Sequence, residues 1–212
     1  MKKTDNLIVV SGMITSTIKY DFSSHGERFF RFEIMSIRLS GATDTISCVI
    51  PEILINHITS DVAEFIGEIH TRNIHREDGK SKLDIFLFVK QVGEYVDGEY
   101  EENKGELKGY ICKPPVYRKT PLGREIADVL LAVNRAYGKS DYIPCIVWGR
   151  NAERVSKLEV GSRIEVVGRL QSREYTKRIN ENESEQRTAY EFSVSKLIVE
   201  GDTDGSEDND GN

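Results

Sequence analysis

The chain has 212 residues, with 29 lysines and arginines against 35 aspartates and glutamates, a net charge of −6, and 38% hydrophobic residues. This length allows one large domain or two small ones, because domains usually contain roughly 100–150 residues. No charge-free stretch reaches the roughly 20 apolar residues that a bilayer requires, and no signal-peptide pattern is present. Cys48, Cys112 and Cys145 lie far apart, so no disulfide framework is predicted and a cytoplasmic location is expected.

The acidic residues concentrate in two segments. Residues 201–212 hold five acids and no base, which is typical of a disordered tail because such a segment cannot bury enough apolar surface to order itself. Residues 94–106 carry six acids and one lysine, which favours a linker. Of the remaining residues, 1–93 hold 11 bases and 12 acids, whereas 107–200 hold 17 bases and 12 acids. One half of this acidic chain is therefore basic, so a nucleic-acid partner stays open.

The sequence contains an internal repeat. A shift of 97 positions aligns nine identical residues: Gly12 with Gly109, Ile14 with Ile111, Tyr20 with Tyr117, Gly26 with Gly123, Arg38 with Arg135, Gly41 with Gly138, Asp44 with Asp141, Ile46 with Ile143, and Cys48 with Cys145. After a small gap the shift becomes 101, and it pairs residues 66–69 with 167–170. The chain is thus predicted to consist of two related units, which we call copy one (residues 1–93) and copy two (residues 107–200).

Hydrophobic alternation predicts mainly strands in each copy. In copy two the strands are expected at residues 127–133, 142–148, 163–175 and 190–199. A short helix is expected over Ala152, Val155 and Leu158, ending near Gly161. Five strands with one helix between the third and fourth are typical of an OB-fold, so we predict an all-β chain of two tandem OB-fold five-stranded barrels.

Aromatic and basic side chains alternate on the outward faces of the copy-two strands. Aromatic rings stack on bases of any sequence, and cations follow the phosphates, so such a surface favours single-stranded nucleic acid. The alternative interpretation is that the rings belong to the barrel core and the charges are only solvated. We take the interface candidates to be Tyr137, Tyr142, Trp148, Tyr175, Arg150, Arg169 and Arg173.

Copy one lacks these aromatic residues. Its residues at the four aromatic positions are Ser40, Thr45, Pro51 and Ile74, and Glu68 replaces Arg169. The glycines and the apolar alternation are retained. We therefore expect copy one to keep the fold and to contribute little base stacking, although Phe29, Phe30 and Phe32 offer partial compensation or core packing.

Copy two resembles bacterial single-stranded DNA-binding proteins. The resemblance lies in residues 109–124, 131–135, 143–153 and 161–173, which include the runs LAVNR, IPCIVWGRNAE and VGRLQSR. It implies a protein that coats single-stranded DNA without strong sequence preference in replication, recombination and repair. The stacking aromatics of the family fall on or near Tyr137, Tyr142, Trp148 and Tyr175, and the basic candidates in these segments also include Arg118, Lys119 and Arg124.

The resemblance also implies partners. Family members usually assemble four OB units, so a homodimer of this two-unit chain is expected. The acidic tail of the family usually ends in an apolar tip that recruits repair and replication proteins, and the end of this tail, DNDGN, lacks one. An alternative is a replication or recombination accessory protein that acts mainly through protein contacts.

Enzymatic function is disfavoured. No Walker loop, HExxH, GxSxG or Rossmann pattern occurs. His70 and His75 lack a second ligand cluster, and the Glu181, Glu183 and Glu185 run falls in an expected loop, so neither a metal nor another cofactor is predicted.

Overall fold

The computed structural model describes residues 5–75, 79, 81–95, 102–178, 180 and 183–199. Copy one contains β1 (Asn6–Ile14), β2 (Lys19–Ser24), β3 (Glu27–Ile37), β4 (Thr43–Pro51), α1 (Glu52–Ile55), β5 (Val62–His75) and β6 (Ser81–Gly93). Copy two contains β7 (Asn103–Ile111), β8 (Val116–Lys119), β9 (Glu125–Asn134), the 3-10 turn η1 (Ala136–Gly138), β10 (Ser140–Trp148), α2 (Arg150–Ser156), β11 (Arg163–Arg178) and β12 (Ser184–Val199). The order of elements is the same in both, as the repeat predicts.

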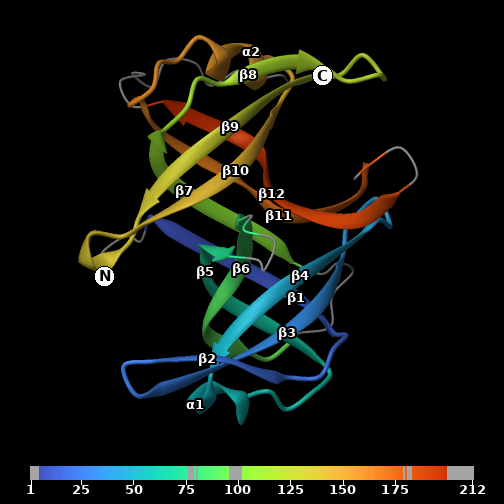
Figure 1. The fold of residues 1–212 in the computed structure, drawn as a ribbon, viewed down its shortest axis with the longest axis vertical. Coiled ribbons are helices and arrows are strands. Elements are labelled where there is room, and N and C mark those ends of the chain that lie inside the picture. Colours follow the sequence, from blue (N-terminus) through green and yellow to red (C-terminus); the bar gives the residue numbers. More distant parts are fainter. Residues whose placement is uncertain are drawn as a thin grey trace, which may run out of the picture.

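Each copy closes into a five-stranded barrel. The strand order β3-β4-β6-β5-β1 is closed by pairing of β1 with β3, and β9-β10-β12-β11-β7 is closed by pairing of β7 with β9. Strand β4 pairs in parallel with β6, and β10 pairs in parallel with β12. One helix lies between the third and fourth barrel strands of each copy, at opposite ends of the molecule (Figure 1). The predicted tandem OB-fold architecture is therefore confirmed.

The repeated glycines permit barrel closure. A Cβ atom on Gly12 would lie 2.5 Å from the Met35 carbonyl oxygen, and one on Gly109 would meet the Ala132 carbonyl oxygen in the same way. At these points β1 and β7 bend from one neighbouring strand to another. A side chain there would force the strands apart, which is why both copies keep glycine.

Alternate residues of each strand fill the two barrels. Phe32, Phe65, Ile46 and Ile69 are fully or almost fully buried in copy one, and the fully buried residues of copy two include Leu131, Ile143 and Phe192. In β10 the inward residues Ile143, Cys145 and Val147 alternate with outward Tyr142 and Trp148. This agrees with the parity read from the sequence, and Phe32 belongs to the core, in contact with Phe65.

The two barrels join into one 12-stranded sheet through antiparallel pairing of β1 with β7. The pairing is centred on Ile8 and Gly105, which are equivalent positions of the repeat, so the copies are related by an approximate two-fold axis. Other contacts obey the same symmetry. The Asn6 side chain exchanges hydrogen bonds with the Ile69 backbone, and the Asn103 side chain does so with the Leu170 backbone.

Buried aspartates fasten the junction between copies. Asp44 is fully buried, binds Arg38 of its own copy, and accepts a hydrogen bond of 2.8 Å from the Ser172 amide of β11. Asp141, its repeat partner, pairs with Arg135 and accepts a hydrogen bond from the Thr71 amide of β5. The Arg–Asp pairs found as sequence identities thus fix one copy against the other.

Three features differ from the sequence predictions. The β2 and β8 hairpin strands were not expected, because their residues are mostly exposed and lack apolar alternation. The copy-two helix ends at Ser156, and Gly161 instead occupies a later turn with a φ of 94°. β7 begins at Asn103, inside the segment expected to be a linker, because its first residues pair with β1.

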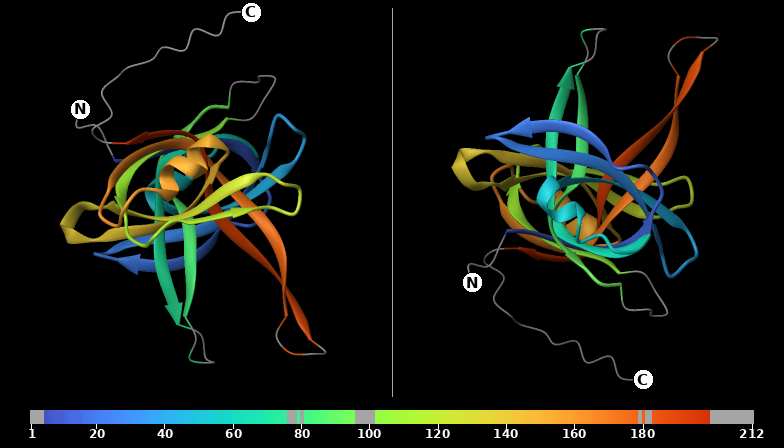
Figure 2. Two further views of the ribbon diagram at one scale, coloured as in Figure 1. Left: turned by 90° about the horizontal axis from the view of Figure 1, so that it is seen from above. Right: turned by 90° about the horizontal axis from the view of Figure 1, so that it is seen from below.

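Two long hairpins, β5–β6 and β11–β12, project to the same side of the molecule (Figure 2). The strands of the second hairpin continue to Arg178 and from Ser184, so Glu185, which was expected in a loop, lies in β12. The expected tail, residues 201–212, lies outside the described residues.

Candidate nucleic-acid interface

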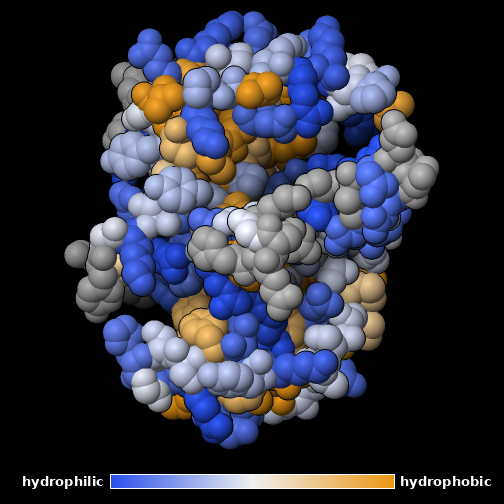
Figure 3. Space-filling view, in the orientation of Figure 1, coloured by the Kyte–Doolittle hydropathy of each residue, from blue (hydrophilic) through white to orange (hydrophobic). Residues whose placement is uncertain are grey.

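A groove of about 1490 Å³ opens on copy two at the junction with copy one. Its floor comes from β10, β11 and β12, and its walls come from the β8–β9 turn and from the turn between β3 and β4 of copy one. Figure 3 shows the surface hollowed on this side, between the upper unit and the β11–β12 hairpin. The bases that line the groove outnumber the two acids, Glu102 and Glu191, and are Arg38, Lys104, Arg118, Arg124, Arg169 and Arg173.

Half of the sequence-predicted residues meet at this groove, namely Trp148, Arg118, Arg124, Arg169 and Arg173. Four others lie outside its lining: Tyr142, Tyr175, Lys119 and Arg150. The backbone of Tyr137 lies in η1, but its side chain lies outside the described part. The groove therefore gathers most of the basic candidates and one of the four aromatic candidates.

Trp148 stands at the end of β10, half-buried against the groove floor. Its indole Nε1 donates a hydrogen bond of 3.1 Å to Ser193 Oγ on β12. This bond fixes the ring while part of its surface remains accessible. A fixed aromatic ring beside cations is a suitable platform for base stacking.

The cations of the groove differ in how they are compensated. Arg118 forms a salt bridge with Asp128, with Nε and Oδ2 2.6 Å apart, and this hydrogen bond raises the pKa of Arg118. Burial, together with the nearby charge of Arg38, lowers the pKa of Arg169. Arg173 is exposed, and its guanidinium lies 5.7 Å from the Tyr175 ring centroid. Arg169 and Arg173 thus offer positive charge toward the groove.

The remaining aromatic candidates occupy other surfaces. Tyr142 is 49% exposed on the outer face of β10, where its backbone amide donates to Thr71 Oγ1 of copy one. Tyr175 lies in the projecting part of β11, opposite Arg187 of β12. A strand that contacted Tyr142, Trp148 and Tyr175 together would have to extend along the barrel and the hairpin.

The equivalent groove of copy one is filled by side chains. Strand registers match Phe29 to Ile126, Phe86 to Glu191 and Phe88 to Ser193, and these three copy-two residues line the open groove. In copy one, Phe29 and Phe86 are almost fully buried in a cluster with Val49, and Phe22 stacks on Phe29 at 4.9 Å. Phenylalanines thus occupy the volume that copy two leaves open.

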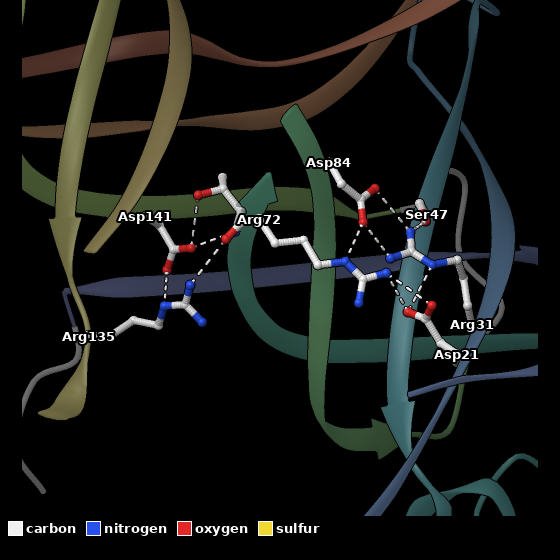
Figure 4. Close-up of polar contacts among 8 residues, drawn as sticks. Asp21, Arg31, Ser47, Arg72, Asp84, Arg135 and Asp141 are labelled. Atoms are coloured by element: carbon white, nitrogen blue, oxygen red, sulfur yellow. Dashed lines mark hydrogen bonds and ion pairs between the residues drawn. The ribbon is translucent and has the colours of Figure 1, made fainter. Parts of the chain in front are cut away.

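Copy one also neutralises its own cations, as Figure 4 shows. Arg31 and Arg72 each form ion pairs with both Asp21 and Asp84, at distances between 2.7 and 3.2 Å. Burial by itself would lower the pKa of Arg72, but the hydrogen bonds and charges of Asp21 and Asp84 have the larger effect. The pKa of Arg72 is therefore raised. The counterpart of Arg72 is Arg173, which faces Ala189 where Arg72 faces Asp84.

Sequence reasoning missed the wall that copy one contributes to the groove, especially Arg38 and Leu39. Arg38 was visible as a repeat identity, but nothing local indicated that the β3–β4 turn reaches the other barrel. Lys104 was missed because it was assigned to the linker. These residues meet the groove only through the junction of the two copies.

Metal ligands and cysteine thiols were the other candidate groups to consider in the described ranges. No three histidine, cysteine or acidic side chains there form a metal-binding group. Burial raises the pKa of the Cys48 and Cys145 thiols, which favours their unreactive protonated form. Neither helix has the length and apolar character needed to cross a membrane within that part of the chain.

The fold and the groove define a tandem OB-fold protein with one open cationic groove and one filled groove. Residues 102–199 match the model of the "Single-strand binding protein family". The matched segment begins next to the first residue of β7, spans copy two, and makes up a little under half of the chain.

Curated relatives match a part of the chain. Single-stranded DNA-binding protein 1 of Staphylococcus aureus (strain COL) is 42% identical over 80 residues, covering 34% of this chain and 48% of that protein. Single-stranded DNA-binding protein A of Bacillus subtilis (strain 168) is 40% identical over 92 residues, covering 40% of this chain and 51% of that protein. The chain thus spans about half the length of the curated relatives it matches.

A solved structure matches the whole fold. A deletion mutant of the single-stranded DNA binding protein from Thermus aquaticus superposes with a TM-score of 0.72 at 17% identity, covering 98% of this chain and 100% of that one. The tandem arrangement of both barrels is therefore shared by a known protein.

Proposed function

We propose that this chain binds single-stranded DNA and coats it without strong sequence preference, in DNA replication, recombination and repair. The observation that carries the proposal is the open groove of copy two, where Trp148 is fixed beside an excess of cations. Stacking is worth roughly 1–3 kcal/mol per base and tolerates any base, and the cations supply sequence-independent affinity. The matched family segment supports the same function.

In this proposal the DNA contacts are Trp148, Arg118, Arg124, Arg169 and Arg173 in the groove, extended by Tyr137, Tyr142, Tyr175, Lys119 and Arg150 on the adjoining surfaces. Copy one serves as a scaffold. We divide the chain into two OB-fold units, residues 1–93 and 107–200, with an acidic connection over 94–106 and an acidic tail over 201–212.

The proposal is for a binding protein rather than an enzyme, acting in the cytoplasm at the nucleoid. We further propose a homodimer, which would bring four OB units together. Replication and repair proteins are the partners that the acidic tail would contact in this proposal. Mass measurement in solution tests the dimer.

The direct test uses intrinsic fluorescence, because Trp148 is the single tryptophan of the sequence. Addition of oligo-dT should quench its emission, and the affinity should fall steeply as salt rises, because bound cations release counterions. Absence of quenching at low salt in folded protein would refute stacking on Trp148. A duplex of the same length serves as the control and should quench far less.

A further inference from the structure

The turn between β3 and β4 of copy one forms a wall of the copy-two groove. Arg38, Leu39 and Ser40 of this turn line the groove together with Arg169 and Ser172 of β11. Leu39 is 80% exposed, so it covers no core of its own copy. The turn belongs to copy one but is a candidate contact surface for a ligand in the copy-two groove.

Hydrogen bonds hold this turn in a fixed position beside β11. Arg38 Nε lies 2.7 Å from Asp44 Oδ2, and the same carboxylate accepts the Ser172 amide at 2.8 Å. The Thr45 amide donates to Ser172 Oγ at 2.9 Å. The groove wall is therefore placed before any ligand arrives, which lowers the entropic cost of binding.

Two guanidinium groups line the groove at this place, and the Asp44 carboxylate pairs with that of Arg38. Asp44 is engaged by Arg38, while Arg169 lies near enough for the charge of Arg38 to lower its pKa. Within the described ranges, the buried Nε of Arg169 has no hydrogen-bond partner, and its Nη2 reaches only Gln171 Oε1 at 3.4 Å. A buried donor without an acceptor costs free energy, and an excess cation attracts an anion.

We propose that one phosphate of the bound strand occupies this junction beside Arg169 and Arg38, with Leu39 packed against the adjoining nucleotide, so that copy one forms part of the DNA interface. This inference rests on the proposed function. A phosphate at this place would balance the positive charge of the second guanidinium, that of Arg169. Leu39 supplies apolar contact, as side chains beside stacked bases commonly do.

The test introduces a charge of either sign at position 39 of the turn in the full chain. Leu39→Glu should weaken binding of labelled oligo-dT at low salt by about tenfold or more, because a carboxylate then faces the phosphate. Leu39→Lys should weaken binding less than Leu39→Glu does, because it loses the apolar contact but its ammonium group attracts the phosphate. Ile53→Glu is the matched control, since Ile53 is 73% exposed on α1 of the same copy and should change affinity less than twofold. Melting temperatures verify that each variant is folded.

A second measurement locates the phosphate. Arg169→Gln should reduce the slope of log affinity against log salt by about 0.7, the loss of one phosphate contact on a single strand. If Leu39→Glu binds like the parent while Trp148→Ala is weakened, the strand avoids the junction and this inference fails, although the proposed function stands. If both variants bind like the parent, the proposed function fails as well.

Discussion

In copy one the groove volume is filled by Phe29, Phe86 and Phe88, with Phe22 stacked on Phe29. The positions of copy two that are equivalent to the first three hold Ile126, Glu191 and Ser193, and Arg118 lies opposite Ile126. The barrels around these positions are the same, strand for strand. The difference therefore lies in the side chains placed on a shared backbone. It teaches that an OB barrel can keep its core and its junction while its outer groove is opened or filled.

The two copies also differ in how their charged side chains are paired. Copy one pairs Asp21 with Arg31, and copy two reverses this pair as Arg118 with Asp128. At the junction, Glu68 of copy one stands where copy two has Arg169, and hydrogen bonds from His70 and Lys90 lower the pKa of Glu68. Copy one thus pairs Arg31 and Arg72 with Asp21 and Asp84, whereas copy two leaves Arg169 and Arg173 facing its groove.

The largest expected effect is a loss of stability when the buried aspartate that both copies share is removed. Asp44→Ala and Asp141→Ala should each lower the free energy of unfolding by about 3 kcal/mol, because each leaves an arginine without its buried partner and a junction amide unpaired. Chemical denaturation measures this loss. Asp128→Ala, which removes an exposed ion pair, is the control and should cost less than about 1 kcal/mol. Equal small losses at all three positions would show that the junction is not fastened by the aspartates.

The next effect separates the copies. Trp148→Ala should weaken oligo-dT binding by about 1–3 kcal/mol, because the stacking platform is removed. Pro51→Ala, at the same position of copy one, should leave affinity unchanged. Fluorescence anisotropy of a labelled oligonucleotide measures the affinity of both variants, since Trp148→Ala has no tryptophan whose emission could be followed. A comparable loss from both variants would contradict the division between an open and a filled groove.

A reciprocal exchange asks whether charge alone distinguishes the copies. Ala189→Asp places a carboxylate opposite Arg173, as Asp84 lies opposite Arg72, and should weaken binding by about 0.5–1 kcal/mol through a new ion pair. Asp84→Ala should not tighten binding, because phenylalanines still fill the copy-one groove. Titrations at one low salt concentration measure both. If Asp84→Ala tightened binding as much as Ala189→Asp weakens it, charge and not volume would explain copy one.

Much of this comparison was present in the sequence. Strand parity placed Tyr142 and Trp148 outside the barrel because a barrel strand alternates strictly between core and surface. The repeat revealed both units, since the same core must be built twice. The filling of the copy-one groove was not predictable in this way. Phe22, Phe29 and Phe88 come from three strands, and only the closed barrel brings their rings together.

The groove wall formed by Leu39 escaped prediction for a related reason. An exposed leucine in a turn carries no periodic signal, and its position depends on the β1–β7 pairing and the Asp44 contacts. Likewise, Asn103 and Lys104 were hidden in an acidic segment, where composition favoured a linker over a strand. The positions of these residues are determined by pairing between strands that lie far apart in the sequence, and no local pattern predicts them.

The smallest expected effect sharpens the electrostatic part of the comparison. Deletion of residues 201–212 should tighten oligo-dT binding about twofold to threefold at low salt, because a segment of five acids competes with phosphates for the copy-two cations. The gain should vanish near 1 M salt, where the Debye length is about 3 Å.

A matched variant of unchanged length separates charge from bulk in the tail. It replaces the five acids through Asp202→Asn, Asp204→Asn, Glu207→Gln, Asp208→Asn and Asp210→Asn. If competition is electrostatic, this variant should tighten binding as much as the deletion does, and neither change should restore affinity to Trp148→Ala. Tightening by the deletion alone would point to steric exclusion, and unchanged affinity in both would show that the tail does not reach the groove.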